Sequence, residues 1–122
     1  MRRDYGLYLD DIVQAIGCIR EYVAGTDEEQ FKSDRKTRDA VIRNLEVIGE
    51  ASRNLPETLK EAIAEVDWRK VVGLRNILAH EYFGVSIPIL WDVLQNKLEP
   101  LESVCQRMLR QLKEQEGKNS TD

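Results

Sequence analysis

Arg75-Asn76-Ile77-Leu78-Ala79-His80-Glu81-Tyr82 is the stretch around which this chain is organised. It contains the only histidine among the 122 residues, so any chemistry that needs an imidazole must take place here. The apolar residues of 68–79 follow helical spacing, and Arg75 falls inside the arc that they form. A charge on a core-facing stripe is costly unless it is paired and hydrogen-bonded. Arg75 is therefore either the partner of a buried carboxylate or the floor of a polar cleft.

The composition around this stretch indicates one small helical domain. The chain is long enough for one hydrophobic core but not for two. Apolar residues make up 42% and charged residues 33%, with three prolines and seven glycines, which suits a mostly helical protein. The formal charge of −4 gives no global basic field, so any contact with nucleic acid must be local.

Helical periodicity covers most of the sequence, and nothing is typical of a strand. The apolar spacing predicts helices over 4–24, 34–54, 56–64, from 67 to just past 80, and over 87–112. We expect an all-α, antiparallel bundle of about five helices.

Capping and breaking residues set the expected helix ends. Gly25 suits the end of the first helix, and Thr26-Asp27-Glu28-Glu29 has the pattern of a capping box. Ser33-Asp34 is the expected cap of the helix that follows it, and Asp67 is the expected N-cap of the helix that carries the motif. Pro100 predicts a kink, or two abutting helices, within 87–112.

We expect a single domain over residues 1–113, followed by a polar, disordered tail of residues 114–122. The N-terminus leads into an amphipathic pattern without the apolar region of a signal peptide, and no apolar run reaches the ~20 residues that span a bilayer. Cys18 and Cys105 stand alone on apolar stripes, which favours buried reduced thiols. We expect a cytoplasmic protein without membrane contact.

The helix at 34–54 carries a charged ridge that includes Asp39, Arg43, Glu46, Glu50 and Arg53. Such a ridge is most simply a solvated face with ion pairs between neighbouring turns. The alternative is that Glu46 or Glu50 supplies the carboxylate that Arg75 needs.

Two blocks of this sequence resemble a known family. Arg75-Asn76, followed by His80-Glu81-Tyr82-Phe83, resembles the Arg-x4-His-x-Tyr signature of HEPN-domain toxins of the HepT type. Arg43-Asn44-Leu45-Glu46-Val47-Ile48-Gly49-Glu50-Ala51 resembles the other recurrent block of that family. The resemblance covers most of residues 5–112.

This resemblance implies an endoribonuclease toxin that works without a metal or cofactor. It implies a type VII-like toxin–antitoxin system, in which the partner is a minimal nucleotidyltransferase antitoxin that AMPylates the motif tyrosine, here Tyr82. It also implies a HEPN-like homodimer whose two motifs face a shared cleft. Arg75 and His80 would be catalytic, and Asn76, Glu46, Glu50 and Arg43 would support them.

The residues alone make metal-free RNA cleavage chemically reasonable. It needs a base for the 2′-hydroxyl, an acid for the 5′-oxygen and a cation for the charge at phosphorus. His80 titrates near neutrality, and the fork of Arg75 suits two phosphate oxygens. One histidine does not easily serve as acid and base at once, which gives a reason for dimerisation. A lone histidine matches no transition-metal site, whereas Mg²⁺ held by Asp39, Glu46 or Glu50 stays open.

Each of these residues also has a structural interpretation. His80 suits a helix C-terminus, Arg75 a structural ion pair, and Tyr82 the edge of a core. Asn76, four residues before His80, either orients the imidazole or is solvated. The alternative function is a non-catalytic HEPN interaction or nucleotide-binding module that partners a minimal nucleotidyltransferase. The intact motif favours the ribonuclease, and the negative charge favours the module.

Overall fold

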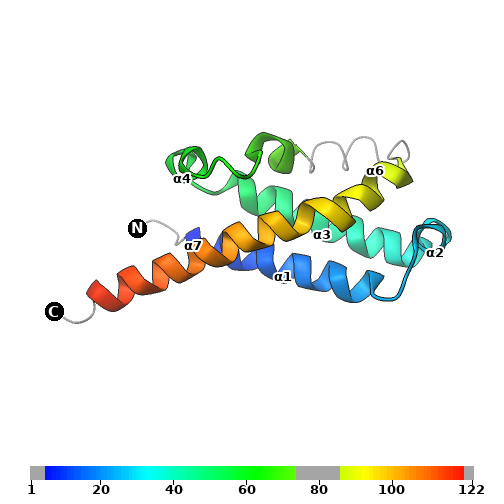
Figure 1. Cartoon of the computed structure of the whole chain (residues 1–122), viewed down its shortest axis with the longest axis horizontal. Coiled ribbons are helices and arrows are strands. Elements are labelled where there is room, and N and C mark those ends of the chain that lie inside the picture. The colour runs from blue at the N-terminus through cyan, green and yellow to red at the C-terminus, as the bar shows by residue number, and fades with distance from the viewer. Residues whose placement is uncertain (1–4, 74–85, 120–122) are drawn as a thin grey trace.

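The computed structural model of the chain describes residues 5–73 and 86–119, with side chains to residue 115. This part is all-α and contains no strand, which confirms the predicted fold class. The long helices are α1 (Tyr5–Val23), α3 (Arg35–Arg53) and α7 (Leu98–Asn119), and α1 runs antiparallel to the other two (Figure 1). The shorter elements are α2 (Glu28–Ser33), α4 (Glu57–Ala62), α6 (Ile87–Asp92) and a π-helical stretch, Val93–Lys97.

One hydrophobic core joins the three long helices, because each presents an apolar stripe with helical spacing to the others. The face of α1 that bears Leu9, Ile12, Ile16 and Ile19 is fully buried. It packs against α3 and α7. The buried residues contributed by those two helices include Val41, Leu45 and Ile48 from α3 and Leu101, Val104, Cys105 and Met108 from α7.

The turns between α1 and α3 follow capping chemistry closely. Gly25 has a φ of +72°, the left-handed conformation expected of a residue that ends a helix. The capping box lies at Asp27 rather than Thr26, and its reciprocal partner is Gln30. Asp27 accepts from the Gln30 backbone N–H at 2.8 Å, and the Gln30 side chain accepts from the Asp27 N–H at 2.9 Å. The predicted capping box, Thr26 to Glu29, therefore lies one residue too early in the sequence. The shift is possible because Asp is also a strong N-cap and Gln can replace Glu at N3.

We expected a kink or two abutting helices around Pro100, and the structure has abutting helices, because α6, the π-helical stretch and α7 follow one another without a gap. α6 passes through the π-helical stretch into α7 (Figure 1). Pro100 lies in the first turn of α7. Proline has no N–H for the Asn96 carbonyl, and its ring would clash with that carbonyl in a regular α-helix. The wider π-turn changes the backbone register just before Pro100, so the local irregularity precedes the proline.

α7 continues to Asn119, past residue 113, where we placed the end of the domain. None of the helices in the described ranges has the length and apolarity that a membrane span requires. Cys105 is buried as predicted, whereas Cys18 is only half-buried, because it lies at the edge of the buried stripe of α1. Both cysteines are free thiols.

Candidate functional site

Four predicted site residues, Arg75, Asn76, His80 and Tyr82, lie outside the residues that the structure describes. Their roles, and the predicted pairing of Arg75 with Glu46 or Glu50, therefore stay predictions. The structure does describe how the chain enters this stretch, how it leaves it, and where Arg43, Glu46 and Glu50 lie on α3.

The chain enters the motif stretch as a helix, which residues 68–73 already form. Asp67 begins this helix: its carbonyl accepts from the N–H groups of Lys70 and Val71, at 3.1 and 3.2 Å, and its Oδ1 lies 3.5 Å from the Lys70 nitrogen. The prediction that Asp67 is the N-cap is confirmed. Trp68, in the first turn, is buried with 7% of its surface exposed, and Val71 packs against the core. This helix is therefore anchored on the core at its start.

Two polar contacts fix the segment before this helix to the bundle. Lys60 of α4 is buried, and its Nζ donates to the Ser52 carbonyl at 3.3 Å and lies 3.1 Å from Oε1 of Glu57. Since Ser52 lies in the last turn of α3, Lys60 supplies a further donor to a carbonyl that also accepts from the Leu55 N–H at 3.2 Å. Further along, Arg107 of α7 donates to Oε2 of Glu65 at 2.6 Å. Neither contact was predicted from the sequence, because lysine and arginine are ordinarily surface residues.

The chain leaves the motif stretch into α6, which begins after Ser86. Its Leu90 is buried, and its Trp91 meets Phe31 of α2 with ring centroids 5.4 Å apart and the rings tilted by 42°. Phe31 is completely buried. Tilted aromatic pairs of this kind are favourable contacts, so α6 is held against α2 near its C-terminal end.

The predicted supporting residues share one face of α3. Arg43 and Glu50 are exposed, and Glu46 is half-buried. Arg43 and Glu46 make no ion pair within the part of the chain that the structure describes. Glu46 and Glu50 lie one turn apart on the same face, as a ridge of charge requires. The charged ridge predicted from the sequence is therefore present on one face of α3. The face of α3 that packs into the core is mainly apolar, as expected.

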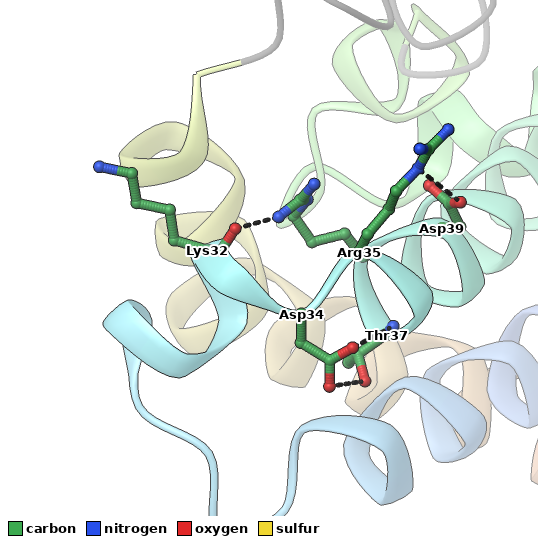
Figure 2. A network of polar contacts seen from close by, with 6 residues as sticks. Lys32, Asp34, Arg35, Thr37 and Asp39 are labelled. Carbon is green, nitrogen blue, oxygen red and sulfur yellow. Dashed lines mark hydrogen bonds and ion pairs between the residues drawn. The ribbon is translucent and has the colours of Figure 1, made fainter.

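A cluster of cations surrounds the junction between α2 and α3 (Figure 2). Arg38 donates to the Lys32 carbonyl and so links the two helices. Arg35 and Asp39 form an exposed pair, with Nε and Oδ2 3.9 Å apart. Of the predicted cap Ser33-Asp34, Asp34 is the N-cap of α3, and it accepts from the Thr37 hydroxyl at 2.7 Å and the Thr37 backbone N–H at 3.1 Å. These hydrogen bonds, first the hydroxyl and then the N–H, hold the pKa of Asp34 below its usual value.

The remaining titratable groups offer little further chemistry. Burial raises the pKa of the Cys105 thiol to about 12, so it is not a nucleophile at neutral pH. Among residues 5–73 and 86–115, no three His, Cys, Asp or Glu side chains gather as a metal site would require.

Comparison with known proteins extends over nearly the whole chain. Residues 12–108 match the family described as "Ribonuclease HepT-like". A relative from Thermococcus cleftensis, named "Probable ribonuclease HepT", is 39% identical over 88% of this chain and 98% of its own length. A protein of Methanocaldococcus jannaschii, named as a candidate RNase, is 37% identical over 83% of this chain and 93% of its own. The "mRNA nuclease HepT" of Shewanella oneidensis is 28% identical over 62% of this chain and 75% of its own. No solved structure is significantly similar.

Proposed function

Because the chain belongs to the HepT-like ribonuclease family, we propose that it is an endoribonuclease that cleaves RNA without a metal ion. The observation that carries this proposal is that the family match spans residues 12–108, a range that includes Arg75, His80 and Tyr82 at the spacing of the family signature. The described structure supports it less directly, since both ends of the motif stretch are fixed to one core.

The reaction is attack of the substrate's own 2′-hydroxyl on the adjacent phosphorus. His80, as neutral imidazole, takes the proton from the 2′-hydroxyl while the bond from the 2′-oxygen to phosphorus forms. The bond from phosphorus to the 5′-oxygen breaks, and that oxygen takes a proton from a second imidazolium. Arg75 stabilises the negative charge on the phosphoryl oxygens. The products are a 2′,3′-cyclic phosphate and a 5′-hydroxyl.

A homodimer supplies the second imidazolium, because each chain holds a single histidine. The partner subunit's His80 would act as the acid when His80 acts as the base. Residues 67–82 would line the shared cleft, with Asn76 orienting the imidazole. Glu46 or Glu50 would pair with Arg75, and Arg43 would extend the polar wall. The interface should bury at least ~1,000 Å², as specific contacts do.

We further propose that the chain is the toxin of a toxin–antitoxin pair whose antitoxin is a minimal nucleotidyltransferase. AMP attached through the Tyr82 oxygen would place a phosphate and an adenine in the cleft. The added charge would pair with Arg75 and exclude RNA. Tyr82→Phe should therefore keep RNase activity but escape silencing. Co-expression with the antitoxin, followed by intact-mass measurement, tests this; AMP still attached to Tyr82→Phe, or full rescue of growth, would contradict it.

The alternative is a non-catalytic module that only docks the nucleotidyltransferase, which the net charge of −4 favours. Cleavage of RNA by the purified chain separates the two functions. The ribonuclease proposal expects cleavage by the wild type and none by His80→Ala, with the same helical content for both. Equal cleavage by both proteins would mean that the activity does not depend on the motif.

A further inference from the structure

An ion pair with α7 lies directly before the helix that leads into the motif stretch. Arg107 of α7 donates from Nη2 to Oε2 of Glu65 at 2.6 Å, and Asp67, two residues after Glu65, begins the helix of residues 68–73. We call residues 68–73 the entry helix. We propose that Arg107 is a positioning residue, which acts through Glu65 to fix the tilt of the entry helix and so the placement of the motif stretch that follows. The inference rests on the proposed function for its effect on cleavage.

The segment between α4 and the entry helix depends on this pair for its direction. α4 ends at Ala62, and residues 63–66 form a turn and a bend before Asp67. Ile63 and Val66 pack against the core, but apolar packing is non-directional. Glu65 has the only polar side chain of residues 63–66. Its charge-assisted hydrogen bond with Arg107 is therefore the contact of these side chains that depends on angle as well as distance.

α7 holds Arg107 in a fixed place. Val104 and Met108, three residues before it and one after it, are buried in the core. On α7, Glu102 pairs with Arg20 of α1. Five residues separate Glu102 from Arg107, which places the two side chains about 140° apart around the helix. One edge of α7 is therefore tied to α1, and the other edge is tied to the segment that precedes the entry helix.

The pair contributes little to the stability of the fold. Arg107 and Glu65 keep 43% and 54% of their side chains exposed, and exposed ion pairs stabilise proteins only slightly. Trp68, in the first turn of the entry helix, is buried and anchors that turn without the pair. What the pair adds to this anchor is an angular constraint.

A small tilt of the entry helix would displace the motif by a distance that matters for catalysis. The sequence predicts that this helix continues to just past residue 80, and His80 lies twelve residues after Trp68, about 18 Å along a helix. A tilt of about 3° at Trp68 would then move His80 by about 1 Å. A displacement of this size in a catalytic group costs about a hundredfold in rate.

The test compares Arg107→Gln with Arg20→Gln, which removes the same charge from the other ion pair of α7. The two arginines are similarly exposed, at 43% and 47% of the side chain. Glutamine keeps the helix propensity of arginine. A third variant, Glu65→Arg/Arg107→Glu, exchanges the two charges and so restores the pair.

The placement of the motif is measured without substrate, by NMR. Because the chain has one histidine, the C2–H proton of His80 gives one histidine signal, which is assigned by its loss in His80→Ala. Cleavage of a single-stranded RNA is measured on the same four proteins, with kcat and KM determined separately.

We expect the His80 signal to move by more than its linewidth in Arg107→Gln, to stay in place in Arg20→Gln and to return in the exchanged variant. The kcat of Arg107→Gln should be about ten- to a hundredfold lower at an unchanged KM, and the exchanged variant should recover most of it. The Tm of each variant should stay within about 4 °C of the wild type, because both pairs are exposed. A residue that only stabilised the fold would lower the Tm and leave the kcat of the folded protein unchanged.

A His80 signal that does not move in Arg107→Gln would overturn the proposal. So would an equal movement in Arg20→Gln, a movement that the exchanged variant does not reverse, or an unchanged kcat in Arg107→Gln when the wild type cleaves. A wild type that cleaves no RNA, while the His80 signal still follows the pair, refutes only the proposed function.

Discussion

Phe31→Ala tests how α2 holds α6 through Trp91. Phe31 is completely buried and forms a tilted pair with Trp91, with ring centroids 5.4 Å apart, so its truncation removes apolar burial, leaves a cavity and breaks an aromatic pair. Truncations of this kind cost about 3–5 kcal/mol. An unfolding entropy of about 2.1 cal/mol/K per residue gives about 0.26 kcal/mol/K for the 122 residues. The Tm should therefore fall by about 12 to 20 °C.

Differential scanning calorimetry compares the Tm of Phe31→Ala with the Tm of two control variants, Phe31→Leu and Ile89→Ala. Phe31→Leu keeps most of the volume and should cost about 1 kcal/mol. Ile89→Ala, on the exposed side of α6 at 68% exposure, should change the stability by less than about 0.5 kcal/mol. A fall of less than about 4 °C for Phe31→Ala, equivalent to about 1 kcal/mol, would show that this ring does not anchor α6.

Two further variants and one labelling experiment follow from the buried polar groups. Lys60→Met should stay within about 1.5 kcal/mol of the wild type in urea unfolding, since the Ser52 carbonyl keeps its bond from Leu55 at 3.2 Å. Lys60→Glu should lose about 3 kcal/mol or more, because it buries a carboxylate beside Glu57; a milder effect would mean that this side chain reaches solvent. A disulfide reagent at pH 8 should label Cys18 in the native protein and Cys105 only after unfolding, because the Cys105 pKa of about 12 leaves almost no thiolate. Equal labelling rates would contradict the burial of Cys105.

The helices were predictable because burial in this bundle follows a single period. The expected helix over 34–54 is Arg35–Arg53 in the structure, and its buried Val41, Leu45 and Ile48 have helical spacing. Its cap could be narrowed to Ser33-Asp34 because few side chains can accept from the first N–H groups of a helix, and the structure assigns it to Asp34.

Other features depend on how neighbouring helices pack against one another, and they could not be predicted from the sequence. Pro100 indicated a disturbance, but where the backbone relaxes depends on how α6 and α7 pack, and it relaxes earlier, at Val93–Lys97. Lys60 carries no sequence signal that separates it from an exposed lysine, since its burial follows from the nearby end of α3. Of the candidate site, the ridge with Arg43, Glu46 and Glu50 is present as predicted, and the roles of Arg75, His80 and Tyr82 stay predictions.

The most direct test of the proposed activity is the chemistry of the RNA ends that the purified protein leaves in the presence of EDTA. We expect a fragment that ends in a 2′,3′-cyclic phosphate, lighter by one water than the linear phosphate, and a partner fragment with a 5′-hydroxyl. His80→Ala should give neither fragment, and an all-deoxy oligonucleotide should stay intact, because both remove a reactant of the transfer. Fragments with 5′-phosphate ends, or cleavage that EDTA abolishes and Mg²⁺ restores, would contradict the metal-free mechanism.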